Sequence, residues 1–148
     1  MNVSQKCQYA LRAVFELASR NTQGPIRIGE IAAAQAIPQR FLEVILGELK
    51  HGGFVESRRG MQGGYMLTVS PKSLCVGQII EFLDGPLGPV KCVAEPKADK
   101  CPLDGNCAFM DLWEQARNAI AEVYHSVTFQ DLVDKHNARQ KYIPCYTI

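Results

Sequence analysis

Apolar residues recur at intervals of three and four along much of the chain, the spacing that places them on one face of an α-helix. The first such stretch predicts an amphipathic helix over residues 3–19. Asn2 or Ser4 would cap its start, because short polar side chains accept hydrogen bonds from the first free backbone amides. The turn-forming sequence at residues 21–25 ends this helix. Its apolar face consists of Val3, Cys7, Ala10, Leu11, Val14, Leu17 and Ala18.

Two shorter helical patterns follow, separated by Ala36-Ile37-Pro38. Pro38 suits the first turn of the second helix, where its missing N–H is not needed, and Gly52-Gly53 ends that helix. Two short helices joined by a tight turn predict a helix-turn-helix. Their apolar faces are Ile28, Ile31 and Ala32 in the first, and Leu42, Ile45, Leu46 and Leu49 in the second.

A β-hairpin is predicted directly after these helices. Phe54–Ser57 and Tyr65–Val69 are short runs rich in aromatic and β-branched residues, as strands are. The segment between them, residues 58–64, contains two arginines and three glycines. We interpret it as the tip of a wing that follows the helix-turn-helix; an ordinary surface hairpin is the alternative. The glycines form no dinucleotide-binding motif, since no βαβ context surrounds them.

The second half of the chain is also predicted to be helical. Residues 75–83 form a short buried helix that Gly85-Pro86 ends, whereas residues 86–106 show no period, as in a functional or disordered loop. From about Cys107 a helix of roughly 30 Å begins, and such a long apolar stripe commonly pairs with a second copy in a symmetric dimer. Thr128 to Asp131 resembles a capping box that opens a last helix. The stripe is Phe109, Leu112, Trp113, Ala116, Ala119, Ile120, Val123, Tyr124 and Val127.

Charge is divided unevenly between the two halves of the 148-residue chain. Residues 1–72 contain nine Lys and Arg against five Glu, a net charge of +4, and residues 73–148 contain seven basic against ten acidic residues, a net charge of −3. A basic half favours binding of a polyanion, with solvated surface charge as the alternative. No stretch approaches the roughly 18 apolar residues of a membrane span, and the N-terminus lacks the layout of a signal peptide. We therefore expect a cytoplasmic protein without a membrane partner.

Candidate DNA-binding residues lie in the second helix of the helix-turn-helix and in the wing. The N-terminal residues of such a helix read base edges in the major groove. Gln39 can pair with adenine, Arg40 with guanine or a phosphate, and Glu43 with a cytosine amino group. Arginines on a narrow tip suit a minor groove. The alternative is a solvated helix face in which Arg40 and Glu43 pair with each other. The candidates are Pro38, Gln39, Arg40, Phe41 and Glu43, with Arg58, Arg59, Gly60, Gly63 and Gly64 in the wing.

Three cysteines, Cys92, Cys101 and Cys107, lie within sixteen residues and are flanked by Pro and Gly. Thiolates bind iron–sulfur clusters or zinc. A structural zinc site usually has C-x2-C pairs and four clear ligands, neither of which is present. Three cysteines leave one cluster position for an exchangeable ligand, which favours a sensor. Free or redox-paired thiols remain the alternative. No grouping of residues typical of an enzyme active site stands out, so we expect no enzymatic activity.

These residues together resemble the IscR/NsrR family of winged-helix transcription regulators. The resemblance implies a homodimer that binds a palindromic operator in double-stranded DNA, and a [2Fe–2S] or [4Fe–4S] cluster on the three cysteines that controls DNA affinity or target choice. We further expect Ser4, Lys6 and Tyr9 to bind phosphates. The matching segments are Ser4-x-Lys6-x2-Tyr9-Ala10, Gly24-Pro25, Ile31-Ala32, Phe41-Leu42-Glu43, Leu49-Lys50 to Gly53, Val55-x-Ser57-x-Arg59-Gly60-x2-Gly63-Gly64-Tyr65-x-Leu67, Val76-Gly77-x-Ile79-Ile80, the three cysteines, and Leu112-Trp113.

The chain departs from this family at the fourth cluster ligand. Relatives of the IscR type have a His three residues after the last cysteine, where this chain has Met110, a poor ligand. Others take a ligand from the partner's first helix, near the position of Gln8. Cys7 could complete an all-cysteine site from there; a buried core thiol is the alternative. Cys75 is predicted to be a core residue, and Cys145 has no assignable partner.

The sequence therefore predicts a mainly α-helical protein with a small β-hairpin wing. Residues 1–72 would form a winged helix-turn-helix DNA-binding domain, residues 73–106 a linking helix and cysteine-bearing cluster loop, and residues 107–148 the dimerisation helix and C-terminal tail. The predicted function is transcription regulation in which an iron–sulfur cluster senses redox state, nitric oxide or iron status. The alternatives are a cluster-free regulator controlled by thiols or a partner and, in another class, an iron–sulfur carrier or zinc-binding interaction module.

Overall fold

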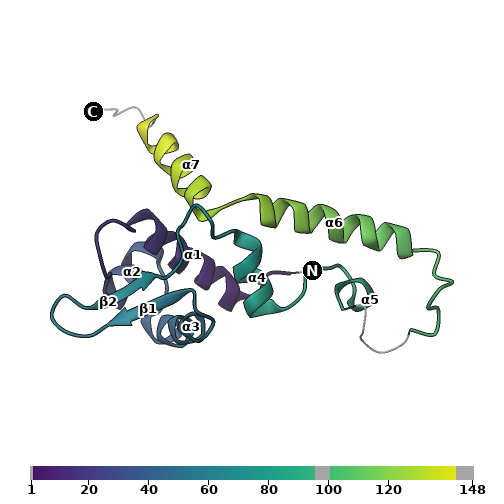
Figure 1. Cartoon of the computed structure of the whole chain (residues 1–148), viewed down its shortest axis with the longest axis horizontal. Helices are drawn as coiled ribbons and strands as arrows, with labels where there is room; N and C mark the ends of the chain where they lie inside the picture. The colour runs from purple at the N-terminus through teal and green to yellow at the C-terminus, as the bar shows by residue number, and fades with distance from the viewer. Residues whose placement is uncertain (1, 96–100, 143–148) are drawn as a thin grey trace.

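The computed structural model describes residues 2–95 and 101–142. Helices dominate, and the two strands form one antiparallel hairpin (Figure 1), so the predicted fold class is confirmed. No helix in the described part of the chain is both long and apolar enough to cross a membrane. The elements are α1 (Gln5–Ser19), α2 (Ile28–Gln35), α3 (Gln39–His51), β1 (Val55–Arg58), β2 (Gly64–Leu67), α4 (Val76–Asp84), α5 (Lys91–Ala94), α6 (Met110–Ser126) and α7 (Phe129–Lys141).

Helix α1 is the central element of the core. It contacts α2, α3, α4, α7 and β2. Its cap is Ser4, whose Oγ accepts a hydrogen bond from the Cys7 amide at 3.1 Å. The predicted apolar face is the buried one, because residues at this spacing all turn toward the other helices. Its fully buried members are Cys7, Ala10 and Val14; Ala13, which the predicted face did not include, is fully buried as well.

Helices α2 and α3 form the predicted helix-turn-helix. The turn between them depends on Ala36, which adopts a left-handed conformation (φ +50°) and so ends α2. Ile37 follows and is buried beneath the turn. Pro38 is the residue before α3 rather than in its first turn, and its carbonyl accepts hydrogen bonds from Phe41 and Leu42. The apolar face of α3 is buried as the sequence predicted.

The hairpin pairs Val55 with Leu67 at one end and Arg58 with Gly64 at the other. Arg58 is therefore the last residue of β1, and only Arg59 lies in the turn, which corrects the prediction that both arginines are at the tip. Gly64 has no side chain, so the Ile26 backbone can approach this end of β2. Tyr65 therefore also forms a bridge with Ile26, in which each backbone amide donates to the other residue's carbonyl at 2.8 Å. This bridge ties the wing to the start of the helix-turn-helix.

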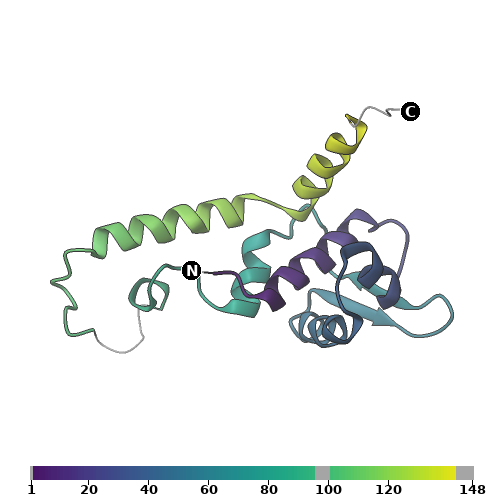
Figure 2. The ribbon, with the colours of Figure 1, turned by 180° about the vertical axis from the view of Figure 1, so that it is seen from behind.

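The segment between α4 and α6 differs from the prediction in two places. It contains a short helix, α5, which carries Cys92 and was not expected. The long helix α6 begins at Met110 rather than near Cys107, because residues 107–110 form a turn in which the Cys107 carbonyl accepts from the Met110 amide at 3.2 Å. Helix α6 contacts α4 and α5 and extends away from the winged body, as the two opposite views show (Figures 1 and 2).

The chain returns to the body between α6 and α7, at a place we call the joint: residues 74–76 beside residues 127–129. Here the Val76 amide donates to the Val127 carbonyl, and the Phe129 amide donates to the Leu74 carbonyl, both at 3.0 Å. Phe129 is completely buried in the same core as α1 and α3. The predicted capping box of α7 is present, since Thr128 and Asp131 exchange hydrogen bonds, which hold the pKa of Asp131 below its usual value.

Candidate nucleic-acid interface and thiol loop

Helix α3 presents a face that its own core does not use. With Leu42, Ile45, Leu46 and Leu49 buried, the remaining positions must face outward, since a helix repeats every 3.6 residues. Gln39, Arg40 and Glu43 are exposed on its first two turns, as are Phe41 and Val44. The Arg40 guanidinium lies 4.7 Å from the centre of the Phe41 ring rather than in an ion pair with Glu43. The first turn thus offers an amide and a guanidinium in the positions from which such helices contact bases.

The start of α1 lies beside α3, but two of the three predicted phosphate contacts already have partners. Ser4 donates from its hydroxyl and its backbone amide to Asp84 of α4, at 2.5 and 2.7 Å. The Lys6 ammonium pairs with Glu48 of α3 at 3.0 Å. Tyr9 lies under the Arg12 guanidinium at 4.8 Å. Phosphate binding by this group therefore stays a prediction, and it requires Lys6 to exchange a carboxylate for a phosphate. A cavity of about 430 Å³ lies here, lined by Gln5, Lys6, Tyr9, Phe41, Val44 and Ile45.

The two arginines of the wing differ in whether a carboxylate lies beside them. Arg58 lies 3.4 Å from the Glu56 carboxylate, whereas Arg59 is exposed and pairs with no carboxylate among the described residues. Arg27, which the sequence analysis did not single out, donates to the Met61 carbonyl and so adds a third guanidinium at the base of the turn.

The backbone geometry of the wing requires glycine at three positions. A Cβ at Gly63 would overlap the Arg58 carbonyl, and one at Gly64 would overlap the Ile26 carbonyl. Gly60 has a φ of +109° and open space around it. Gly63 and Gly64 therefore shape the hairpin, while only Gly60 leaves room for another molecule to approach its backbone.

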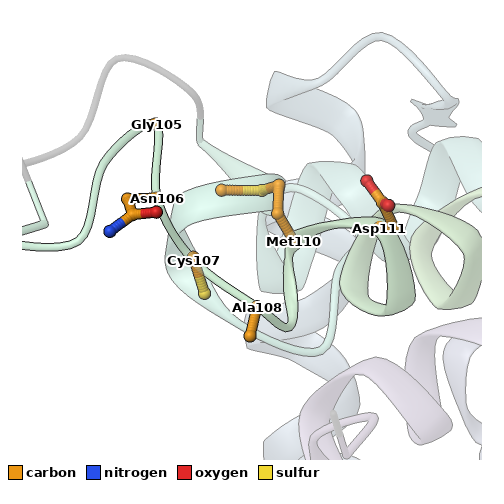
Figure 3. A pocket seen from close by; sticks show the side chains of 6 residues that line it. All are labelled: Gly105, Asn106, Cys107, Ala108, Met110 and Asp111. Carbon is orange, nitrogen blue, oxygen red and sulfur yellow. The ribbon is translucent and has the colours of Figure 1, made fainter.

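The three cysteines of the predicted cluster site are free thiols: Cys92 lies in α5, and Cys101 and Cys107 lie between α5 and the start of α6. Cys92 and Cys101 are exposed and Cys107 is half-buried. Cys107 lines a cavity of about 440 Å³ together with Gly105, Asn106, Ala108, Met110 and Asp111 (Figure 3). Within residues 2–95 and 101–142, no three Cys, His, Asp or Glu side chains lie close enough to hold one metal ion. The donor type fits an iron–sulfur cluster, whose irons prefer thiolates, but the described part of the loop does not assemble the ligands.

The two candidates for a fourth ligand lie elsewhere in the protomer. Cys7 is fully buried against Ile80 and Leu87, and burial together with the nearby Asp84 carboxylate raises the pKa of its thiol to about 12. A thiolate ligand is disfavoured there, and the alternative of a core thiol is the one the packing supports. Gln8 is exposed, and its side-chain amide donates to the Val3 carbonyl at 3.0 Å.

One cluster of chemically active side chains was not found by sequence reasoning. Cys75 is not a core residue, which corrects the prediction: α4 begins at Val76, so Cys75 lies at its cap, half-buried. Its Sγ is 3.4 Å from Nδ1 of His125, and Nε2 of that ring is 3.3 Å from Glu81. Cys75 and His125 are fifty positions apart, and no local pattern in the sequence relates them. Cys145 lies outside the described residues.

Comparisons with known proteins agree on one family. A family model described as Rrf2, iron-dependent transcriptional regulator, matches residues 3–135. The HTH-type transcriptional regulator CymR of Bacillus subtilis is 32% identical over 141 residues, which are 95% of this chain and 96% of CymR.

Solved structures give the same result. The structure of B. subtilis CymR, the global cysteine regulator, has a TM-score of 0.75 at 33% identity and covers 91% of this chain and 98% of its own. T. potens IscR has a TM-score of 0.74 at 30% identity, covering 95% and 91%. The oxidized form of Staphylococcus aureus CymR has a TM-score of 0.66 at 27% identity, covering 90% and 96%.

Proposed function

Because the chain belongs to the Rrf2 family of DNA-binding transcription regulators, which are not enzymes, we propose that it is a homodimeric regulator whose DNA affinity depends on an iron–sulfur cluster in the loop between α5 and α6. The predicted cytoplasmic location and the division into residues 1–72, 73–106 and 107–148 stay part of this proposal. The observation that carries the cluster is the set of three free thiols: Cys92 in α5, which packs against α6, and Cys101 and Cys107 in the segment that leads into α6.

For DNA, the proposal assigns base contacts to the exposed first turns of α3. Gln39 supplies donors for base edges, Arg40 supplies donors for guanine or a phosphate, and Glu43 supplies an acceptor. The wing would follow the backbone or enter the minor groove with Arg59 foremost, since Arg58 shares its charge with Glu56. Two such heads related by a twofold axis would bind a palindromic site, because the spacing of half-sites mirrors the symmetry of the dimer.

The dimer is supported by the apolar side chains that α6 leaves uncovered. None of its residues is buried, and Leu112 and Val123 are more than half exposed. A second face of the same helix, with Ala121 and Tyr124, packs on the protomer's own α4 side. A helix that is apolar on both faces and covered on one of them favours association with a second copy.

For the cluster, Cys92, Cys101 and Cys107 would be the ligands from this chain. A bound cluster would supply a redox-active centre that oxidants and nitric oxide can attack. The chain's own part is to hold the loop: α5 packs against α6, and the turn at residues 107–110 leads directly into it. Ordering or releasing the loop would therefore act on the start of the dimerisation helix. A coupling of about 1.4 kcal/mol would change DNA affinity tenfold.

The test is anaerobic purification and iron–sulfide reconstitution of the wild-type chain and of Cys92→Ala, Cys101→Ala and Cys107→Ala, with Cys75→Ala as the matched control. We expect visible absorption and bound iron and sulfide in the wild type and the control, and loss of both in the three loop variants. A colourless wild-type protein without iron after reconstitution would remove the cluster from the proposal.

A cluster-free thiol regulator is the second candidate, and a specific observation favours it. The described residues assemble no three-ligand metal group, and a relative of the same fold, S. aureus CymR, has a structure of an oxidized form. This candidate predicts that reconstituted protein binds no iron, while a thiol oxidant still changes its affinity for DNA. Metal analysis by mass spectrometry also separates both candidates from a zinc-binding module.

A further inference from the structure

Cys75, His125 and Glu81 form a row of three side chains where the end of α6 meets α4. Sγ of Cys75 lies 3.4 Å from Nδ1 of His125, and Nε2 of the same ring lies 3.3 Å from the Glu81 carboxylate. Thiol, imidazole and carboxylate in this order are the arrangement that activates a cysteine. The imidazole takes the proton of the thiol, and the carboxylate orients the imidazole.

One tautomer of His125 satisfies both contacts. Nδ1 without a proton can accept from the thiol, whose other acceptor within reach is Oε1 of Gln78 at 3.3 Å, and Nε2 with a proton then faces the Glu81 carboxylate. Cys75 is also the cap residue of the nine-residue helix α4, and the free amides of a helix N-terminus stabilise a thiolate. The Cys75 backbone amide donates to Oε1 of Gln78 at 2.9 Å, which fixes the residue in the cap position.

The other described cysteines lack this combination. Cys7 is fully buried, so reagents in solvent do not reach it. Cys92 and Cys101 are exposed and Cys107 is half-buried, but none of the three forms a hydrogen bond to an imidazole within the described ranges. Cys75 alone among these combines partial exposure with a base in contact with its sulfur.

We propose that Cys75 is a modification site at which a hydroperoxide oxidises the thiol to a sulfenic acid. His125 takes the thiol proton, and the thiolate attacks the terminal peroxide oxygen. An S–O bond forms as the O–O bond breaks, and the leaving oxyanion, hydroxide in the case of hydrogen peroxide, takes the proton from the imidazolium. The sulfur loses two electrons and the peroxide gains them, so the products are the sulfenic acid and water.

Cys75 lies within the joint, so its oxidation changes the position of α6 relative to α4. Cys75 is between the two residues, Leu74 and Val76, whose backbones bond to the segment that connects α6 with α7. The His125 ring cannot move closer to α4, because it already packs against Gly77: a Cβ added to Gly77 would lie only 2.8 Å from the ring atoms. An oxygen added to the sulfur therefore pushes α6 away from α4. Only the consequence for DNA affinity rests on the proposed function.

The first experiment measures the chemistry without DNA or iron. Iron-free full-length protein is treated with hydrogen peroxide in the presence of dimedone, which traps sulfenic acids, and labelling at each cysteine is followed by peptide mass spectrometry. We expect Cys75 to be labelled about tenfold faster than Cys92 and Cys101 in folded protein, and at the same rate as they are in urea. Equal rates in the folded protein would overturn the proposal.

The role of the imidazole is tested with His125→Ala. Labelling at Cys75 should fall about tenfold while labelling at Cys92 stays unchanged, and added free imidazole should restore much of the loss. Rescue by imidazole separates a proton acceptor from a merely structural side chain. A Cys75 rate that His125→Ala leaves unchanged, or that imidazole does not raise, would contradict the assigned role.

The effect on the joint is measured by hydrogen exchange of the same protein before and after peroxide. Peptides that contain the amides of Val76 and Phe129 should exchange faster after oxidation, and peptides from α2 and α3 should not change. Cys75→Ser treated with peroxide is the control and should show no change in either region. Unchanged exchange at the joint of fully oxidised wild-type protein would refute the coupling.

Discussion

At the scale of single residues, the wing depends on two glycines that admit neighbouring backbone. Gly64 has a φ of +151° and lies against the Ile26 carbonyl, so a methyl group there would strain the backbone and break the bridge between Ile26 and Tyr65. Gly47, in contrast, lies in the exposed part of α3 with ordinary helical backbone and nothing within 4 Å of an added Cβ. Replacement by alanine should therefore change the free energy of unfolding in opposite directions at these two glycines.

Gly64→Ala should therefore lower the free energy of unfolding by about 1–3 kcal/mol, the usual range for strained backbone. Gly47→Ala should raise it by about 0.5–1 kcal/mol, because alanine loses less conformational freedom in a helix. Urea unfolding followed by circular dichroism measures both. A Gly64→Ala protein as stable as the wild type would show that the hairpin is not as tightly packed as the structure describes.

The sequence predicted some residues of the candidate DNA interface and missed others. Gln39 and Arg40 were predicted because they are N-terminal residues of the second helix of the helix-turn-helix, and both lie outside the buried face of α3. The pairing of Lys6 with Glu48 was not predicted, since these residues belong to helices that are separate in the sequence. Arg27 was missed for the same reason: its neighbour in space is the carbonyl of Met61.

At the scale of the element, one face of α3 is buried in the core and the opposite face is exposed to solvent. Its buried leucines hold it against α1, so exposed residues can be replaced without loss of the fold. Arg40 contacts only the ring of Phe41 among the interactions described. Arg20 is a suitable contrast, because it pairs with Glu16 and Glu30 beside the start of α2.

Arg40→Ala should weaken binding to a generic duplex and reduce the slope of log affinity against log salt by about one phosphate equivalent. The unfolding free energy should stay within about 0.5 kcal/mol of the wild type, as for other surface substitutions. Arg20→Ala is the control and should leave the salt slope unchanged. Fluorescence anisotropy at several salt concentrations measures the slope; an identical slope for Arg40→Ala would exclude a phosphate contact by this residue.

At the scale of the whole molecule, α6 is the helix that buries none of its residues within one chain. It reaches away from the winged body (Figure 2). Leu112 and Val123 on this helix are 54% and 58% exposed. These two residues lie eleven positions apart, three helical turns, on one side of the helix. Gln115 and Asn118 are exposed as well but polar, so they provide a matched surface for a charge control.

The double variant Leu112→Glu and Val123→Glu should sediment as a monomer at concentrations where the wild type is a dimer, because burying two carboxylates in an apolar interface is strongly unfavourable. The double variant Gln115→Glu and Asn118→Asp adds the same charge beside the stripe and should remain dimeric. Analytical ultracentrifugation distinguishes the two. A dimeric Leu112→Glu, Val123→Glu protein would place the dimer interface on another surface.

Local patterns were sufficient for the elements other than α5 and for the outward-facing residues of α3. Apolar spacing, the cap at Ser4, the capping box at Thr128 and the glycines after α3 act between residues that are neighbours in the chain, so the sequence by itself determined them. Tertiary structure alone decided that Ser4 bonds to Asp84, that Phe129 enters the core of the first half, and that Cys75 meets His125. The Ser4–Asp84 and Cys75–His125 contacts join residues eighty and fifty positions apart, and the geometry of all three contacts follows from how the helices pack rather than from any periodicity.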